Sequence, residues 1–324
     1  MTLKKRTLGK SGIQVTEIGL GLWAAGGGEW GETDDKESLS AIDAALDQGV
    51  TFFDTADVYG NGHSEEVLGR AMRGRRDRFI VASKIGWRGF DGEKRATAYK
   101  TPALLIAGVE SNLARLQTDH IDVLQSHISF RDPTMEVFLE GFQKLKRDGK
   151  VRAYGMSSSD YEYIRAFNQD EGCATLQIDY SLLNRTPEPE IFEYCSKHGI
   201  GVIVRGALAM GILTGKLKRD SAFGEGDFRR KWQTEPDQRA VYERDLASVA
   251  ELRGLERNGR TLAQAALQFT LAHPAVTTVI PGARNASQVR GNVAAATAPT
   301  LDRSDWALID RVTPPGGGRK IWPA

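Results

Sequence analysis

Four side chains of this sequence belong to types that together can protonate an oxygen atom: a carboxylate, a phenol, an amine and an imidazole. Asp54, Lys84 and His127 each close an apolar run, and Tyr59 follows Asp54 in the segment DTADVYGNGHSEEVLG. A phenol has a reference pKa of about 10, which is too high for ready proton donation at neutral pH. We expect the Lys84 ammonium to lower the Tyr59 pKa by favouring the phenolate, provided that Asp54 holds the ammonium as an ion pair.

The same residues predict a reaction. His127 can orient a carbonyl oxygen and share in the proton transfer. We therefore expect hydride delivery to the carbon of an aldehyde or ketone, or the reverse, with Tyr59 as the proton donor. Lys84 also fits a Schiff-base aldolase, in which a desolvated lysine attacks a carbonyl. A third possibility is a regulatory or sensor subunit that keeps the scaffold and the cofactor but turns over slowly.

A hydride needs a cofactor, and the segment ARNASQVRGNVAAA offers a place for its phosphate end. Arg284, Gln288 and Asn292 are spaced i, i+4, i+8 on one face of a helix start. Helix N-termini after the last strands of α/β barrels are recurrent phosphate sites. No Asp or Glu stands between Pro281 and Leu301. Because nothing acidic in that segment favours a bare ribose hydroxyl, Arg284 indicates NADP(H) rather than NAD(H).

Eight short apolar runs, separated by longer amphipathic stretches, must position these residues. The alternation predicts parallel βα units, and eight units favour a closed (β/α)8 TIM barrel over an open doubly wound sheet. The runs are TEIGLGL (16–22), VTFFDT (50–55), RFIVASK (78–84), HIDVLQSH (120–127), VRAYGMSS (151–158), TLQIDY (175–180), IGVIVRG (200–206) and VTTVIPG (276–282). In such a barrel, polar residues near strand ends gather on the C-terminal rim. Five runs carry one there: Asp54, Lys84, His127, Gln177 and Arg205.

The other segments complete the prediction of one α/β barrel domain over residues 1–324. TLGKSGIQV is typical of a β-hairpin, which we expect to plug the lower end of the barrel. Residues 217–237 are predicted to form a mobile loop, and the Pro- and Gly-rich tail 314–324 to be irregular. Four residues are predicted to mark helix starts: Thr33, Ser64, Thr134 and Thr261.

The composition is that of an ordinary soluble globular protein, with 40% hydrophobic and 26% charged residues in 324. Lys and Arg number 43 against 42 Asp and Glu, so the net charge of +1 gives no reason to expect nucleic acid or a membrane as a partner. The only cysteines, Cys173 and Cys195, suit a reducing compartment. No apolar run reaches the ~18 residues of a membrane span. We expect a cytoplasmic protein whose partner is a small carbonyl or alcohol.

Two other motifs compete for the cofactor and the chemistry. Gly26, Gly28 and Gly31 fit G-x-G-x-x-G, but acidic residues lead the helix that follows and would repel a pyrophosphate. We interpret this segment as a flexible loop beside the site, in which Trp23 and Trp30 either wall the substrate or only pack. The five histidines show no H-E-x-x-H spacing, so no metal is expected.

A series of motifs occurs in an order and spacing that carry a family resemblance: GLGLW, FFDTADVYGNGHSEEVLG, IVASK, IDVLQSH, GMSSS, LQIDYSLLNR, GILTGK and VIPGARNASQVRGN. On these motifs the sequence resembles the aldo-keto reductases over nearly its whole length. The resemblance implies a (β/α)8 barrel that binds NADP(H) extended across its C-terminal rim. It also implies a catalytic tetrad of Asp54, Tyr59, Lys84 and His127, with Tyr59 as the proton donor.

The resemblance further implies the contacts of the cofactor. Ser157 and Gln177 are expected to hold the nicotinamide carboxamide, and the loop 208–216 to cover the pyrophosphate. The full set of expected cofactor-binding residues is Trp23, Ser157, Ser158, Gln177, Arg205, Gly206, Leu208, Gly211, Leu213, Gly215, Lys216, Gly282, Arg284, Gln288 and Asn292. The substrate mouth is expected to be apolar, with Trp23, Trp30, Trp87 and Phe130 as its walls, while Arg131 and Arg205 favour a polar or anionic group.

Three positions depart from the family's pattern. Ser158 stands where an Asn is common, and its shorter side chain reaches less far. Arg205 replaces the aromatic residue that usually stacks on the nicotinamide; its guanidinium can stack, but its charge disfavours the oxidised cofactor. Many relatives have a basic residue where Gln288 stands, which leaves Arg284 as the main candidate for the 2′-phosphate.

Overall fold

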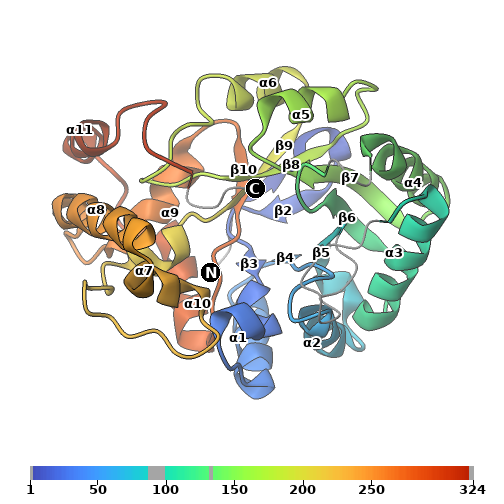
Figure 1. Cartoon of the computed structure of the whole chain (residues 1–324), viewed down its shortest axis with the longest axis horizontal. Coiled ribbons are helices and arrows are strands. Elements are labelled where there is room, and N and C mark those ends of the chain that lie inside the picture. The colour runs from blue at the N-terminus through green and yellow to red at the C-terminus, as the bar shows by residue number, and fades with distance from the viewer. Residues whose placement is uncertain (1–2, 87–98, 131–133, 321–324) are drawn as a thin grey trace.

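Eight parallel strands form a nearly closed barrel with helices around it (Figure 1). The computed structural model describes residues 3–86, 99–130 and 134–320. The strands pair in chain order: β3 (Leu20–Gly21), β4 (Phe52–Asp54), β5 (Ile80–Ile85), β6 (Ile121–Ser126), β7 (Val151–Ser157), β8 (Thr175–Asp179), β9 (Gly201–Arg205) and β10 (Val276–Val279). Parallel bridges from Ile18 to Val279 and from Gly21 to Gly282 join the last strand to the first. The predicted barrel is confirmed, and each predicted run contains one strand.

The helices lie on the outside of the strands (Figure 1). They are α1 (Asp35–Asp47), α2 (His63–Met72), α3 (Pro102–Leu116), α4 (Met135–Arg147), α5 (Tyr161–Phe167), α6 (Ile191–Lys197), α7 (Lys231–Thr234), α8 (Pro236–Leu252), α9 (Leu262–Ala272), α10 (Ala286–Val293) and α11 (Arg303–Val312). In the described part of the chain, no helix is long and apolar enough to cross a membrane.

Two of the four predicted helix starts are confirmed. Thr134 is the N-cap of α4, and Thr261 caps α9 in a reciprocal capping box with Gln264. The other two are wrong by one or two residues. Asp34, not Thr33, caps α1, because its carboxylate accepts from the Lys36 amide. Ser64 lies inside α2, where its hydroxyl donates to the Leu22 carbonyl at 2.8 Å and so ties the helix to the barrel.

The strands separate two hydrophobic layers, because successive side chains on a strand point to opposite faces. Along β6, Val123 belongs to a small cluster inside the barrel, whereas Leu124 belongs to the large layer between strands and helices. The inner cluster also contains Ala82 of β5 and Ala153 of β7. Toward the C-terminal ends of the strands the inward-facing residues become polar. Because every second residue of a strand points into the barrel, the polar side chains near the strand ends gather at one mouth of the barrel.

A hairpin closes the opposite end of the barrel, as predicted. Strands β1 (Lys5–Thr7) and β2 (Gln14–Thr16) are antiparallel, and Leu8, Ile13 and Val15 pack into the inner cluster. The turn is fixed to the barrel because the Lys10 amide donates to the Gly199 carbonyl at 2.7 Å.

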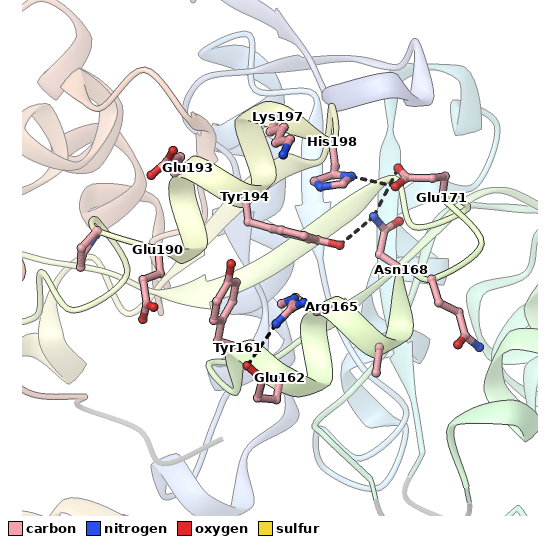
Figure 2. Close-up of a pocket in the computed structure, with 13 residues that line it drawn as sticks. Tyr161, Glu162, Arg165, Asn168, Glu171, Glu190, Glu193, Tyr194, Lys197 and His198 are labelled. Atoms are coloured by element: carbon pink, nitrogen blue, oxygen red, sulfur yellow. Dashed lines mark hydrogen bonds and ion pairs between the residues drawn. The ribbon is translucent and has the colours of Figure 1, made fainter.

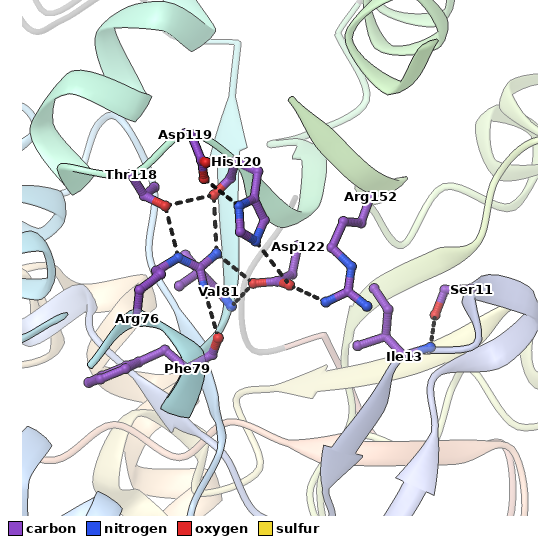
Figure 3. Close-up of polar contacts among 10 residues, drawn as sticks. All are labelled: Ser11, Ile13, Arg76, Phe79, Val81, Thr118, Asp119, His120, Asp122 and Arg152. Atoms are coloured by element: carbon purple, nitrogen blue, oxygen red, sulfur yellow. Dashed lines mark hydrogen bonds and ion pairs between the residues drawn. The ribbon is translucent and has the colours of Figure 1, made fainter. Parts of the chain in front are cut away.

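A buried carboxylate joins three strands at the same lower end (Figure 3). Asp122 accepts from Arg76 and from the Val81 amide, both at 2.8 Å, and from Arg152 at 2.6 Å. The imidazole of His120 lies 3.9 Å from the same carboxylate. Because Asp122, Val81 and Arg152 stand near the N-terminal ends of β6, β5 and β7, this network stabilises the barrel far from its polar mouth.

The segment predicted to be a mobile loop is irregular over 217–227 and partly helical after it. Within 217–237, a short 3-10 turn at Phe228–Arg230 runs into α7, and α8 begins at Pro236. Aromatic contacts join Trp232 to Phe223 and Phe228 in this segment, and its mobility stays a prediction. The tail is irregular up to residue 320, and the Arg185 amide donates to the Gly317 carbonyl at 2.8 Å.

Candidate active site

The four predicted catalytic side chains lie together at the C-terminal mouth of the barrel. The Lys84 ammonium, on β5, donates to Asp54 Oδ1 at 2.5 Å and to Tyr59 Oη at 3.1 Å. Its third bond goes to the Thr55 carbonyl at 2.9 Å. The ring of His127 lies edge-on to Tyr59, with centroids 5.5 Å apart. An acid, an ammonium and a phenol therefore form one hydrogen-bonded chain with an imidazole beside it.

Burial and neighbouring charges together set the pKa values of Lys84 and Tyr59. Lys84 is fully buried, and although burial lowers its pKa, the charges of Asp54 and Tyr59 raise it above the ordinary value. Burial also raises the pKa of the Tyr59 phenol, and this effect outweighs Lys84, which lowers it. The predicted net lowering of the Tyr59 pKa is therefore wrong. The reason is that burial disfavours the charged phenolate by more than the ammonium favours it, and the negative charge of Asp54 raises the pKa further.

The imidazole of His127 is neutral at physiological pH. Burial lowers its pKa well below the ordinary value, and the positive charges of Lys84 and Arg205 lower it further. A neutral imidazole carries one N–H and one lone pair, so it can donate one hydrogen bond to an oxygen without adding a charge to the site.

The predicted nicotinamide-binding residues stand on neighbouring strand ends. Gln177 pairs with Ser157 in the sheet register, and its amide donates to Asp54 Oδ2 at 2.7 Å. Both oxygens of Asp54 thus have donors. The Ser158 hydroxyl shares a hydrogen bond with Ser129 and accepts from the Asp160 amide at 2.9 Å. Ser158 is therefore engaged within the protein itself.

Arg205 ends β9 on the same rim, next to Asp179 in the sheet register. Burial lowers the pKa of its guanidinium, while Asp179, Tyr59 and Asp54 raise it. Its positive charge in turn lowers the pKa of both Tyr59 and His127. The site therefore holds two cations, one paired inside the tetrad and one at the rim.

The segment after β9 is tightly folded. Gly206, Gly211 and Gly215 have φ angles of 69°, 97° and 69°, in the left-handed region that favours glycine. The amides of Gly211 and Leu213 both donate to the Leu208 carbonyl. Lys216 follows the last of these turns, and Leu213 is fully buried.

The predicted phosphate segment also folds as one unit. Gln288 Oε1 accepts from the Arg284 amide at 2.8 Å, and Asn292 donates to the Gly282 carbonyl at 3.4 Å. Asn285 caps α10, with its side chain accepting from the Gln288 amide. Arg284, Gln288 and Asn292 therefore share one surface at a helix start, as predicted.

One premise of the cofactor prediction needs correction, because an acidic residue does lie near Arg284. Asp227, from the segment after β9, has an oxygen 4.0 Å from the Arg284 guanidinium. Its carboxylate also binds Arg229 at 2.6 and 2.9 Å. Arg284 donates to the Trp30 carbonyl as well. Three loops far apart in the sequence thus meet at this guanidinium.

An aromatic group covers the phenol, and one of its members was missed by sequence reasoning. Trp23 stacks on Tyr59, with centroids 5.8 Å apart, and on Phe228 at 5.6 Å. Trp30 meets Trp23 and Phe228 edge-on at 5.2 and 5.1 Å. Phe228 lies in the segment predicted to be mobile, where three aromatic residues among charges and glycines, Phe223, Phe228 and Trp232, are the signal that could have found it. The two tryptophans sit in consecutive 3-10 turns of the segment predicted to be a flexible loop beside the site.

The other predicted substrate walls are placed differently. Phe130 is 5% exposed, stacks on Phe138 at 5.4 Å and contacts Gly86. The structure puts it mainly in the outer hydrophobic layer. Trp87 and Arg131 lie outside the described residues.

A groove of about 750 Å³ lies between α5 and α6 (Figure 2). Tyr161 and Tyr194 line it, and hydrogen bonds from Asn168 to Tyr194 and from His198 to Glu171 cross its floor. None of the four tetrad residues lines this groove, so it is not the place of the tetrad's chemistry. Across the described residues, no group of three or more His, Cys, Asp or Glu side chains is arranged to hold a metal ion.

Comparison with known sequences agrees with this geometry. The sequence model of the Aldo/keto reductase family matches residues 17–314. The aldo-keto reductase YhdN of Bacillus subtilis is 34% identical over 314 residues, covering 94% of this chain and 92% of its own. The NADH-specific methylglyoxal reductase of Escherichia coli is 30% identical, with 90% and 93% covered. A probable voltage-gated potassium channel subunit beta of Arabidopsis thaliana is 29% identical, with 90% and 91% covered.

Solved structures show the same relation. A glycerol dehydrogenase from Gluconobacter oxydans superposes with a TM-score of 0.81 at 33% identity, covering 96% of this chain and 94% of its own. An aldo/keto reductase from Klebsiella pneumoniae, in complex with NADP and acetate, gives a TM-score of 0.75 at 28% identity, with 99% and 100% covered.

Proposed function

The chain belongs to the aldo/keto reductase family, and from this premise we propose that it is an NADP(H)-dependent oxidoreductase that reduces an aldehyde or ketone to an alcohol, or catalyses the reverse reaction. The observation that supports this most strongly is the hydrogen-bonded chain from Gln177 through Asp54 and Lys84 to Tyr59. All three protons of the Lys84 ammonium have acceptors in or beside it, and it ends on a phenol that stacks against Trp23.

The proposed chemistry divides between cofactor and protein. When bound, NADPH supplies the hydride. Tyr59 donates its phenolic proton to the carbonyl oxygen, and the Lys84 ammonium, 3.1 Å away, stabilises the phenolate that remains. Asp54 keeps Lys84 aimed at the phenol, and His127 donates a hydrogen bond to the same carbonyl oxygen. The proton for the developing alkoxide thus comes from Tyr59, and the charge that this leaves on the phenolate is stabilised by an ammonium already in the site.

The residues of the rim fit an NADP(H) cofactor. Arg284 and Arg229 place two guanidinium groups around Asp227, next to the helix start that carries Gln288. Guanidinium groups bind phosphate oxygens in a bidentate manner, which suits a 2′-phosphate. The solved Klebsiella relative carries NADP, whereas the Escherichia coli relative is named as NADH-specific. The proposal therefore includes a preference for NADPH over NADH. A comparison of the dissociation constants of the two cofactors measures this preference directly.

A panel of aldehydes and ketones, followed by loss of NADPH absorbance, tests the proposal. We expect Tyr59→Phe to lose about 10²- to 10⁴-fold in kcat on the best substrate, because it removes the proton donor but keeps the ring. Tyr161→Phe, in the groove between α5 and α6, is the matched control and is expected to keep full activity. Full activity of Tyr59→Phe would show that the assigned proton donor is wrong.

Two other functions make different predictions. A Schiff-base aldolase needs a neutral Lys84 amine, but this side chain is an ammonium with three hydrogen bonds and a raised pKa. A reducible imine at Lys84 would support the aldolase.

The resemblance to a channel subunit leaves a sensor function as the second candidate. NADPH binding without turnover on any carbonyl of the panel would favour the sensor.

We also propose that the protein works in the cytoplasm with small carbonyl compounds or alcohols as its partners. Both cysteines, Cys173 and Cys195, are free and buried. Burial raises the pKa of the Cys173 thiol to about 12, which keeps it unreactive.

A further inference from the structure

The inner face of the barrel below the tetrad carries a second set of buried polar groups. Unlike Asp54, Lys84 and Gln177, these groups have no hydrogen-bond partner among the described residues: both amide atoms of Gln125, the hydroxyl of Thr175 and Nδ1 of His127. Gln125 and Thr175 are fully buried. A buried polar group without a partner costs about 1–3 kcal/mol, and native proteins rarely leave one. Four such atoms in one region indicate a shared ligand.

The sheet register places these groups next to one another. Gln125 pairs with Lys84 on one side and with Gly155 on the other, and Gly155 pairs with Thr175. Val123 lies in the inner cluster, so the alternation along β6 turns Gln125 inward as well. Gly155 has no side chain to separate its neighbours. The Thr175 hydroxyl lies only 2.2 Å from the position that a Gly155 Cβ would take, so it occupies the space that a side chain at Gly155 would fill.

His127 stands directly above Gln125 in this arrangement. The His127 amide donates to the Ile85 carbonyl at 3.0 Å, which continues the parallel ladder one residue beyond β6. Residues two apart on a strand share a face and lie about 6.6 Å apart. The side chains of Gln125 and His127 therefore face the same interior space, with the Gln125 amide between the imidazole and the apolar inner cluster.

We propose that Gln125 is a positioning residue for His127, acting with Thr175 through one internally bound water molecule. The water accepts a hydrogen bond from Gln125 Nε2, donates one proton to His127 Nδ1 and directs the other to the Thr175 hydroxyl, and so pairs three of these four atoms. A buried water typically makes about three such bonds. Since the imidazole is neutral, a lone pair on Nδ1 leaves its only proton on Nε2. The arrangement fixes the tautomer that donates to a substrate carbonyl.

This inference rests on the proposed function only for its effect on rate, because the tautomer of His127 is a property of the free protein. Nitrogen NMR of protein labelled at its five histidines reports it without cofactor or turnover. His127→Asn identifies the His127 signals by their loss. In the wild type we expect Nδ1 to give the signal of an unprotonated nitrogen and Nε2 that of an N–H. An Nδ1–H tautomer in the wild type would overturn the proposal.

Gln125→Met tests the residue itself, since it keeps the length of the side chain and removes its polar atoms. We expect the two tautomers of His127 to mix, kcat for carbonyl reduction to fall about tenfold, and the KM for NADPH to stay within about twofold. Thr175→Val is expected to shift the tautomers in the same direction by a smaller amount. It provides a second test if Gln125→Met fails to fold.

A matched amide away from the site separates positioning from packing. Gln268, on α9, donates to the Ala295 and Ala298 carbonyls, and Gln268→Met is expected to leave the His127 signals unchanged. Unchanged His127 signals in both Gln125→Met and Thr175→Val would refute the proposal even if the protein reduces carbonyls. Conversely, a shift of these signals in a protein without carbonyl reductase activity would refute the proposed function alone.

Discussion

At Tyr59, burial and charge act in opposite directions on one proton. Burial raises the pKa of the phenol, and the Lys84 ammonium lowers it by less. A phenol that keeps its proton is what carbonyl reduction requires of the free enzyme, because it must enter the reaction as an acid. The lysine then acts mainly on the phenolate that forms during the reaction, when the bond of 3.1 Å becomes an ion pair.

A pH profile follows from these shifts. Reduction requires protonated Tyr59, and since burial raises its pKa above the ordinary 10, kcat/KM for reduction is expected to stay flat through neutral pH and fall only above about pH 10. Burial lowers the pKa of His127 well below 6.5, so no transition is expected between pH 6 and 8. The measurement is kcat/KM for NADPH-dependent reduction across pH 6 to 10.5. A transition centred near 6.5 would contradict the neutral state of His127.

The sequence predicted the tetrad because three of its members lie at or next to strand ends and the fourth follows one of them. Chain order alone placed Asp54, Lys84 and His127 on one rim once the barrel was recognised. The neighbours of Arg284 could not be predicted in this way. Asp227 lies 57 positions away along the chain and approaches to 4.0 Å only through the fold of another loop. Tertiary contacts between loops leave no periodic signal in a single sequence.

Among the elements, the segment between β9 and α8 shows how tertiary contacts hold a part of the chain that has no periodic pattern. Phe228 stacks on Trp23, and Arg229 lies over the Trp30 ring at 4.9 Å. Asp227 caps the short turn by accepting from the Arg229 amide. These contacts order a segment whose glycines and charges are typical of a loop. By contrast, Thr261 and its capping box predicted the start of α9 correctly, because a cap is encoded within four consecutive residues.

The same segment is expected to tune the choice between cofactors. Asp227 places a negative charge 4.0 Å from Arg284, the proposed partner of the 2′-phosphate. Asp227→Asn keeps the shape and the cap but removes the charge. Two unit charges at this distance interact by about 1 kcal/mol in water, so the ratio of the NADH Kd to the NADPH Kd is expected to rise about fivefold. Fluorescence titration with both cofactors measures this ratio.

Glu225→Gln removes an exposed charge from the same segment and serves as the control, with an expected change of less than about twofold. Equal weakening of both cofactors by Asp227→Asn would instead assign Asp227 to folding of the segment.

In the whole molecule, stability and chemistry occupy opposite ends of one barrel. The tetrad lies at the C-terminal mouth, whereas the hairpin and the Asp122 network hold the lower end (Figure 3). The strands connect both ends, but the inner cluster of apolar side chains separates them. A change at the lower end should therefore alter the free energy of unfolding without altering the rate of the folded enzyme.

Gly9→Ala in the hairpin turn tests this separation. A Cβ at Gly9 would lie 2.2 Å from the Gly201 amide nitrogen and 2.5 Å from the Gly199 carbonyl oxygen, both of which are backbone atoms that cannot rotate away. The φ of Gly9 is also +52°, which adds backbone strain for alanine. We expect the free energy of unfolding to fall by about 2–4 kcal/mol, measured from the urea midpoint, with kcat unchanged below the transition.

Gly12→Ala isolates the strain from the steric clash, since Gly12 has a φ of +73° but no atom within 4 Å of the position of a Cβ. Its expected cost is about 1–2 kcal/mol, the penalty for a left-handed residue alone. The difference between the two variants measures how tightly the turn is seated against the strand ends. If Gly9→Ala lowered kcat in the fully folded protein, the two ends of the barrel would be coupled, and the hairpin would act on the active site as well as on stability.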